Sequence, residues 1–363
     1  MRICPTLLAL MITPVFAQAQ KSIRLPVHNG GIYFLDVQSR INLQPGDTLL
    51  IPKGISINAV KMTNIHGTRE KPIVITQEDT AGRIGGYKAY GFAMGNATHF
   101  KLRHIHVDGQ HINTGVGIIL GQGCSDFTME YCSADNNAVG IQCKVTPVRG
   151  VAASLYPTAM KNIRIENCSA SNNSTEGFYI GYSAGANDAG LSPVLIDSIY
   201  MTNIRSVNSG WDGIQITRAT NLVGKNWVVN GYGKQATPGQ NSGIALQSDV
   251  TGIIDGFEVT DGDGGGLIIF ARGNLTLKNG KLKKVGQSRL GDGIYVNDFP
   301  TGYKLPPLQL YLENISIDGF NRFPVFIVNK FGTMKPVVFR NVTFKNGPAG
   351  KGIMDGSRRN NAQ

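Results

Sequence analysis

Two acidic residues, Glu176 and Asp212, each stand directly before the same short phrase, in which a glycine is followed by an apolar, a variable and an apolar residue. The phrase recurs along the chain, beginning at Gly117, Gly140, Gly177, Gly213, Gly243, Gly266 and Gly293. If it marks the same strand in successive coils, the two carboxyl groups lie about one strand spacing apart, roughly 5 Å. Carboxyl groups at that distance can share a calcium ion or act as acid and nucleophile of a retaining glycosidase. They can also be turn residues that bond to local backbone N–H groups.

Basic, aromatic and amide side chains share this register. β-Elimination at a uronate needs a group that neutralises the carboxylate, a base, and a group that accommodates the leaving oxygen. Lysine and arginine can fill the first two roles, and lysine acts more readily as the base. Tyrosine can donate a proton to the leaving oxygen. The alternative for each lysine or arginine is a solvated side chain without a chemical role. The candidate catalytic residues are therefore Arg218, Lys144, Tyr179 and Tyr295, the candidate metal ligands are Glu176 and Asp212, and the candidate substrate-binding residues are Gln142, Gln215, Arg272, Asn297 and Asp292.

A second phrase predicts the elements that position these residues. It reads apolar-x-apolar-x-Asn-apolar-x-apolar and is followed by a turn rich in Asn, Asp and Gly, with clean copies at Leu310–Gly319 and Val337–Gly347. Alternation of apolar and polar residues indicates short, half-buried strands. Two runs only two residues apart cannot pair with each other, so each is expected to pair with its copy in the next coil. A repeat made only of short strands and turns predicts a β-solenoid.

The asparagine of this phrase is expected at a bend in the left-handed conformation, which Asn tolerates well. Stacked Asn side chains can also bond one another as a ladder. His104 falls at the same position and is interpreted as a turn residue rather than a catalyst. The predicted ladder consists of Asn167, Asn203, Asn226, Asn279, Asn314 and Asn341.

With these phrases the chain resembles the right-handed parallel β-helix proteins of the pectate-lyase-like superfamily, over roughly Asp36 to Asp355. Its segments LQPGDTLLIPKG and GTREKPIVITQ are similar to the opening coils of chondroitinase B-like and alginate-lyase-like members. The resemblance implies an all-β, single-stranded right-handed parallel β-helix in which the glycine phrase forms the first sheet. It also implies a polysaccharide bound along that sheet. The Lys–Arg motif of chondroitinase B-like lyases and the aspartate set of polygalacturonases are absent from the sequence, so no catalytic residue is carried over.

Long insertions are predicted to wall the first sheet. They follow the glycine phrase at Val145–Lys161, Ser183–Ser198 and Asp298–Gln309, and one precedes it at Gly231–Gln240. Loops held by a rigid scaffold are frequent carriers of function. Because these insertions cluster around one sheet, they favour a binding groove over loops without a function.

The chain of 363 residues is expected to form one elongated domain over residues 20–363, because a solenoid grows by adding coils. Residues 1–19 are expected to be a secretory signal peptide, with Arg2, an apolar stretch and Ala17-Gln18-Ala19. We therefore expect a secreted or periplasmic monomer without a membrane span. The net charge of +11 favours an acidic polysaccharide as partner, and no aromatic-basic phrase typical of nucleic-acid binding is present.

Cys132 and Cys168 are predicted to occupy the same inward position in adjacent coils. They could form a disulfide, or stay as buried free thiols that pack like small apolar residues. For the whole chain, a polysaccharide lyase that cleaves a uronate-containing polymer is the leading functional hypothesis. The alternatives are a glycoside hydrolase of the same fold and a non-catalytic carbohydrate-binding or surface-structural solenoid.

Overall fold

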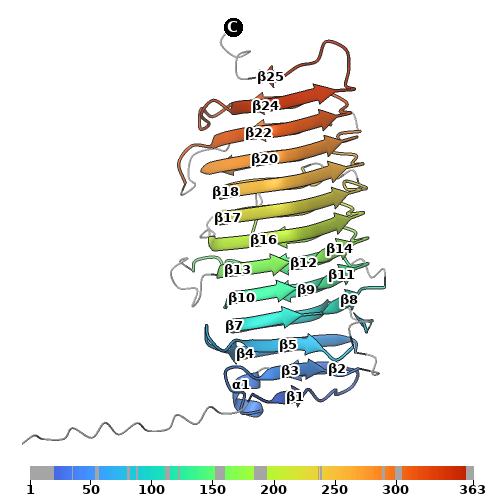
Figure 1. Cartoon of the computed structure of the whole chain (residues 1–363), viewed down its shortest axis with the longest axis vertical. Helices are drawn as coiled ribbons and strands as arrows, with labels where there is room; N and C mark the ends of the chain where they lie inside the picture. The colour runs from blue at the N-terminus through green and yellow to red at the C-terminus, as the bar shows by residue number, and fades with distance from the viewer. Residues whose placement is uncertain are drawn as a thin grey trace, which may run out of the picture.

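The protein is a right-handed parallel β-helix whose coils stack along one axis (Figure 1). The computed structural model describes residues 20–34, 36–53, 57–79, 82–86, 89–110, 115–121, 123–151, 160–183, 194–235, 237, 239–287, 291–298 and 305–356. The 25 strands in this part of the chain join one continuous parallel sheet. The predicted fold class is therefore confirmed, whereas the expected signal peptide lies outside the described residues.

A short helix, α1 (Val37–Arg40), lies beside the first coils (Figure 1). Asp36 caps its N-terminus, because the side chain accepts a hydrogen bond from the Ser39 backbone N–H. Within the described ranges, no helix is long and apolar enough to cross a membrane.

The first sheet carries the glycine phrase. A Cβ atom on Gly140, Gly177, Gly213, Gly243 or Gly266 would lie 2.5–2.7 Å from the backbone oxygen of the glycine one coil further on. Only glycine lets the coils approach this closely, which explains its recurrence in the sequence. The strands that contribute to this sheet are β2 (Gly31–Phe34), β4 (Ala59–His66), β7 (Tyr90–Arg103), β9 (Val116–Leu120), β12 (Val139–Cys143), β15 (Phe178–Ile180), β17 (Ile214–Asn230), β18 (Ile244–Thr260), β19 (Leu267–Arg272), β21 (Ile294–Asn297), β23 (Val325–Val328) and β25 (Met354–Asp355).

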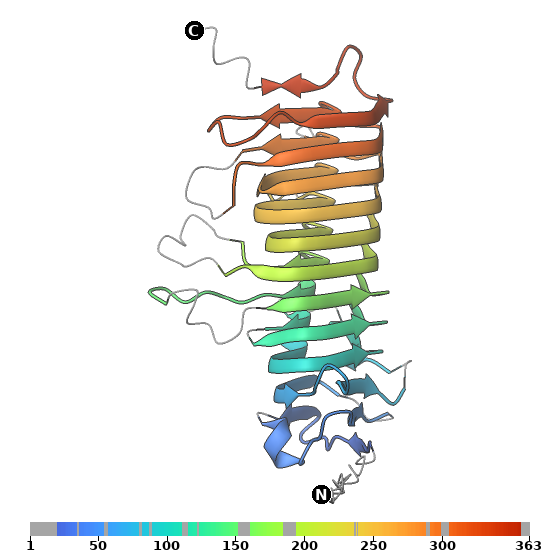
Figure 2. The same cartoon turned by 60° about the vertical axis from the view of Figure 1, so that its left-hand side comes forward.

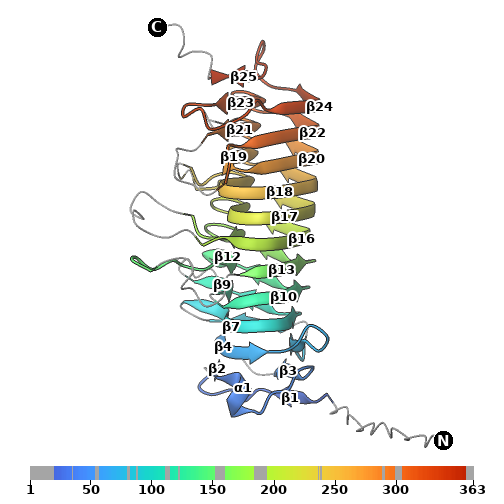
Figure 3. The ribbon, with the colours of Figure 1, turned by 90° about the vertical axis from the view of Figure 1, so that its left-hand side faces the viewer.

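The second and third sheets complete each coil, and several long strands run through the corner between them (Figures 2 and 3). Each strand pairs in parallel with its copy in the next coil, as the sequence predicts. The second sheet adds β1 (Ser22–Arg24), β3 (Thr48–Ile51), β5 (Ile73–Gln77), β10 (Cys124–Glu130), β13 (Lys161–Glu166), β16 (Ile196–Val207), β20 (Asn274–Lys283), β22 (Gln309–Asp318) and β24 (Val338–Lys345), and the third adds β6 (Ile84–Gly85), β8 (His106–Asp108), β11 (Ser133–Asp135) and β14 (Ser169–Ser171).

The predicted asparagine ladder lies at the corner between the second and third sheets. Asn203 donates to Asn167 at 2.8 Å, and Asn341 donates to Asn314 at 3.0 Å. All six predicted ladder residues have φ between 50° and 56°. His104 also has a positive φ of 51°, and its ring stacks on that of Tyr131 with 5.3 Å between centroids. The interpretation of His104 as a turn residue is therefore confirmed.

Stacked apolar rows fill the interior of the helix. On the first sheet, Ile141, Phe178, Ile214 and Ile244 follow one another in register and are almost completely buried. Burial of each such side chain stabilises the fold by roughly 1.5–3 kcal/mol. The opposite, outward-facing row of the same strands is thereby held at fixed positions.

The four cysteines of the described coils are buried free thiols. Cys132 and Cys168 occupy equivalent positions in adjacent coils, since Ser133 pairs with Ser169. Burial and the neighbouring Cys168 thiol raise the pKa of Cys132. The predicted register is confirmed, and of the two expected states the structure contains the free thiols.

The ladder generates a stability prediction. Asn314→Val should lower the free energy of unfolding by about 1–2 kcal/mol, because a β-branched residue is strained at positive φ. The variant also loses the hydrogen bonds to Asn279 and Asn341. Denaturant unfolding followed by circular dichroism measures the change.

Lys281→Val is the matched control, because Lys281 is exposed and does not have a positive φ. We expect it to change stability by less than about 0.5 kcal/mol. Equal destabilisation of the two variants would contradict the role assigned to the ladder.

Candidate functional site

The outward-facing row of the first sheet brings together many of the residues predicted from sequence. Gln142 pairs with Tyr179, and Tyr179 pairs with Gln215. The row continues through Ala245 and Ile268 to Tyr295. Tyr179 and Tyr295 are therefore four strand spacings apart, about 19 Å. The candidates therefore divide into two groups along the axis. We name the first group the Lys144 cluster; it consists of Gln142, Lys144, Glu176, Tyr179, Asp212, Gln215 and Arg218.

Lys144 and Tyr179 form the partly exposed part of the cluster. The Lys144 Nζ lies 4.6 Å from the ring centroid of Tyr179 and 5.7 Å from that of Tyr182. The Tyr179 hydroxyl shares a 2.8 Å hydrogen bond with the Ser183 Oγ. Burial lowers the pKa of Lys144 and raises that of Tyr179. Both shifts favour the neutral side chain, the form in which lysine is a base and tyrosine is a proton donor.

Glu176 and Asp212 occupy equivalent positions in adjacent coils, as predicted, because the Gly177 backbone N–H donates to the Asp212 backbone oxygen. The Oδ1 atom of Asp212 accepts hydrogen bonds from the Ser242 backbone N–H at 2.7 Å and from its hydroxyl at 2.6 Å. Burial raises the pKa of Glu176. Burial and, to a lesser degree, the Glu176 charge raise the pKa of Asp212 to about 7.

Several buried polar atoms of the cluster and of the adjacent Thr217 have no hydrogen-bond partner among the described residues. They are Oδ2 of Asp212, both side-chain polar atoms of Gln215, Oγ1 of Thr217, and Nε and Nη1 of Arg218. Gln215 is 1% exposed and Arg218 is 5% exposed. Burying an unpaired polar group costs roughly 1–3 kcal/mol, and native structures contain few such groups. These atoms lie just before β17 or on its first residues, where they leave several hydrogen-bonding positions open to a polar ligand group.

The second group lies around Tyr295, toward the C-terminal end of the sheet. Asp292 is paired with the Arg322 guanidinium and accepts a hydrogen bond from the Phe323 backbone N–H at 3.2 Å. The Nε of Arg272 donates to the Leu305 backbone oxygen at 2.9 Å. Both residues therefore hold neighbouring backbone in place, although the Nη1 of Arg272 and the Oδ1 of Asn297 have no hydrogen-bond partner within the described part of the chain.

Tyr295 itself belongs to an aromatic stack. Its ring lies 5.5 Å from that of Phe326 and 5.4 Å from that of Phe270 between centroids. This stack covers part of the sheet with apolar ring faces, whereas the Lys144 cluster brings together basic, acidic and phenolic side chains.

The described ends of the predicted loops adjoin the first sheet, whereas residues 152–159, 184–193 and 299–304 lie outside the described residues. β12 ends at Cys143 and β13 begins at Lys161, while β15 ends at Ile180 and β16 begins at Ile196. Tyr182 and Ser183, which sequence reasoning did not select, come from the start of the second of these connections and contact Lys144 and Tyr179. Their only signal in the sequence is proximity to the end of the glycine phrase.

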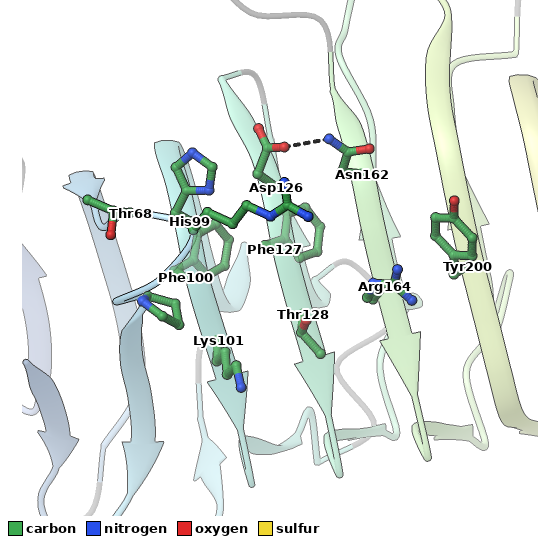
Figure 4. Close-up of a pocket in the computed structure, with 12 residues that line it drawn as sticks. Thr68, His99, Phe100, Lys101, Asp126, Phe127, Thr128, Asn162, Arg164 and Tyr200 are labelled. Atoms are coloured by element: carbon green, nitrogen blue, oxygen red, sulfur yellow. Dashed lines mark hydrogen bonds between the residues drawn. The ribbon is translucent and has the colours of Figure 1, made fainter. Parts of the chain in front are cut away.

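A separate cavity of about 640 Å³ lies on the second sheet (Figure 4). Its lining includes Lys101, Arg164 and Tyr200. These residues share the outward position of the second sheet, since Lys101 pairs with Thr128, Thr128 with Arg164, and Arg164 with Tyr200. Sequence reasoning confined to the first sheet missed this cavity, although the register alone could have aligned these side chains.

Comparison with known proteins supports the same architecture. A family model described as "right handed beta helix region" matches residues 46–192. The chain is a right-handed parallel β-helix protein. Its fold is similar to that of an alginate lyase from Paenibacillus sp. str. FPU-7, with 14% sequence identity, coverage of 91% of this chain and 99% of that chain, and a TM-score of 0.52.

Two weaker similarities are to a pectate lyase, with 14% identity, coverage of 92% and 80%, and a TM-score of 0.47, and to the A-module of a mannuronan C-5 epimerase from Azotobacter vinelandii, with 15% identity, coverage of 93% and 91%, and a TM-score of 0.45. A search of curated proteins returned no match. At these identities the similarity concerns the fold, and the chemistry must be argued from the residues of this chain.

The environment of Asp212 generates a pH prediction. Its pKa rises from the ordinary 3.8 to about 7 on folding, so the folded protein binds more protons than the unfolded chain between these values. The free energy of unfolding should therefore fall as the pH rises from about 4 to about 7, by up to roughly 4 kcal/mol from this group. Urea unfolding across this pH range measures the slope.

Asp212→Asn should flatten this dependence, because asparagine does not ionise while its oxygen can still accept from Ser242. Asp261→Asn, at an exposed position, should leave the slope as in the parent. A slope that is the same in parent and Asp212→Asn would show that Asp212 does not titrate in this range.

Proposed function

We propose that the protein binds an acidic, uronate-containing polysaccharide along the first sheet and cleaves it by β-elimination at the Lys144 cluster. The observation that carries this proposal is the buried Arg218 guanidinium with two unpartnered nitrogen atoms, close to a lysine and a tyrosine held toward their neutral forms. The expected export to the exterior or the periplasm would bring the protein to such polymers, and a monomer is sufficient because one chain carries the whole cluster.

Arg218 would bind the carboxylate of the reacting sugar. A guanidinium can donate two parallel hydrogen bonds to a carboxylate, and such charge-assisted pairs are strong in buried surroundings. Pairing would neutralise the carboxylate, which makes the hydrogen on the adjacent carbon easier to remove. Gln215 and Gln142, on the same outward row, would bind sugar hydroxyl groups.

Lys144 would act as the base. As a neutral amine it takes the proton from the carbon beside the carboxylate, and the electron pair of that C–H bond forms a carbon–carbon double bond. The bond from the neighbouring carbon to the glycosidic oxygen then breaks. The products are a chain with an unsaturated end and a chain that carries the released oxygen.

Tyr179 would protonate this leaving oxygen. Its pKa is raised by burial, so the phenol keeps its proton until the oxygen departs. Proton exchange with solvent then returns Lys144 to the amine and Tyr179 to the phenol. Ser183, bonded to the Tyr179 hydroxyl at 2.8 Å, would orient the phenol.

The calcium expectation for Glu176 and Asp212 stays a prediction. Calcium takes about six to eight oxygen ligands, and no group of three or more His, Cys, Asp or Glu side chains suited to a metal occurs in the described part of the chain. Lys144 adds positive charge beside Glu176. Because this donor set fits calcium poorly, no step of the proposed reaction uses the ion.

The raised pKa of Asp212 favours a second candidate, a glycoside hydrolase. A carboxyl group with a pKa of about 7 keeps its proton at slightly acidic pH and can protonate a glycosidic oxygen. Glu176 in the adjacent coil would then be the nucleophile or base. This reaction adds water across the bond and forms no double bond, so the products distinguish it from elimination.

The test is a screen of the purified protein against alginate, polygalacturonate and glycosaminoglycans, followed by the ultraviolet absorbance of the unsaturated product. Lys144→Met should lower kcat by about 10²-fold or more if Lys144 is the base. Arg218→Lys should raise KM and lower kcat, because the charge remains while the forked geometry is lost. Arg205→Lys, at an exposed position on the third sheet, is the matched control and should behave as the parent.

If the products carry new reducing ends but no ultraviolet absorbance, and Asp212→Asn abolishes their formation, the glycoside hydrolase hypothesis replaces elimination. Binding without cleavage of every polymer would favour a non-catalytic carbohydrate-binding solenoid. A chelator that removes activity, with recovery on addition of calcium, would establish the metal prediction and revise the reaction accordingly.

A further inference from the structure

The cavity on the second sheet has a strongly basic lining. Arg69, Lys101 and Arg164 contribute three cationic side chains, and Asp126 contributes the one carboxylate among the lining residues that the structure describes. That carboxylate is already engaged, because its oxygens accept hydrogen bonds from Asn162 at 2.5 Å and from the Ser125 hydroxyl at 3.0 Å. Figure 4 shows the Asp126–Asn162 bond at one edge of the cavity, with Lys101 and Arg164 on either side of the strand that carries Thr128.

These three cations form no ion pair with a carboxylate in the described part of the chain. The contrast with the next outward-facing row of the same sheet is informative. There Arg103 pairs with Glu130 at 2.7 Å, and Arg340 pairs with Glu313 at 2.8 Å. The sheet therefore pairs cations with carboxylates two residues further along the strands, but leaves the cations of the cavity uncompensated.

Tyr200 holds one of these cations in place. The Arg164 guanidinium carbon lies 4.3 Å from the Tyr200 ring centroid, a stacked cation–π contact. Stacking uses the face of the guanidinium and leaves its N–H groups free for an anion. A cation fixed before the ligand arrives loses less conformational entropy on binding than a free side chain.

The spacing of the cations indicates what kind of anion fits. Lys101 and Arg164 stand two strands apart on the same outward row, roughly 10 Å along the axis. At this spacing each side chain can contact its own anionic group on one polymer that runs along the axis. The regular stacking of strands holds the two backbone positions at a constant separation for such a ligand.

We propose that this cavity is a second glycan-binding site, in which Lys101 and Arg164 bind two anionic groups of one acidic polysaccharide segment. The site lies on a different sheet from the Lys144 cluster and takes no part in the proposed cleavage. A chain that is bound there stays attached to the protein while the first sheet is empty. The cavity would therefore retain the polymer on the protein. Binding in the cavity does not depend on whether the first sheet cleaves the polymer.

The experiment uses the full-length double variant Lys144→Met, Arg218→Gln as background, so that cleavage and binding on the first sheet are both suppressed. Isothermal titration with size-fractionated oligouronates from alginate and polygalacturonate then measures the remaining site. Adding Lys101→Gln and Arg164→Gln should weaken this binding at least about tenfold, since two charge-assisted contacts are lost. Tyr200→Leu should weaken it by a smaller factor, because Arg164 keeps its charge but loses its support.

Arg205→Gln in the same background is the matched control, since Arg205 is an exposed arginine on β16, the strand that carries Tyr200, but lies in the third sheet. It should bind oligouronates as the background does. Monosaccharide uronate and inorganic phosphate should bind far more weakly than the oligomers. Circular dichroism melting confirms that each variant is folded.

Unchanged oligouronate affinity after the Lys101 and Arg164 substitutions would overturn the proposal, and so would inorganic phosphate binding as tightly as the oligomers. If Arg205→Gln loses as much affinity as the cavity variants, the loss reflects the overall charge of the protein and not a site in the cavity. That result would also overturn the proposal. Absence of cleavage by the parent protein would count against the proposed function only, because the background variant is already unable to cleave.

Discussion

Hydrogen bonding between the backbones of successive coils is the constraint on which the rest of this structure depends. At the first-sheet corner, the coils approach until a Cβ atom on the recurring glycines would collide with the backbone oxygen of the next coil. At the corner between the second and third sheets, residues in the left-handed conformation turn the chain, and Asn side chains bond to one another along the axis. Together the two corners fix the register, and the register determines which side chains become neighbours.

In a β-helix, each coil repeats the previous one, shifted along the axis, so a site is assembled from side chains at equivalent positions of successive coils. Residues far apart in the sequence, such as Lys144 and Tyr179, come together because they occupy neighbouring positions in adjacent coils. Lys144, Glu176 and Asp212 are themselves largely buried, and this burial shifts the pKa of each in the direction that favours its neutral form. The stacked coils thus supply rigid positions, and local burial at those positions supplies the shifted pKa values.

The fold and much of the candidate site could be predicted from the sequence because both are periodic. Counting from the glycine phrase aligned Gln142, Tyr179 and Gln215 correctly, and counting from the Asn phrase located the ladder and the bend at His104. The engagement of Asp292 by Arg322, and of Arg272 by the Leu305 backbone, was not predictable, since each partner comes from an irregular connection that carries no repeat. The cavity beside Arg164 was missed for another reason: the periodic signal was followed on one face of the coil only.

The unpaired atoms on β17 have a consequence for how this protein could change. Arg218 adopts a φ of 50°, where a long side chain is strained, and it buries donors that have no partner among the described residues. Gln215 likewise buries an amide without partners within that part of the chain. A methionine at position 215 or a glycine at position 218 would relieve these costs and yield a more robust solenoid. Both side chains therefore lower the stability of the ligand-free solenoid, and a polar ligand that bonds to them would recover part of that cost.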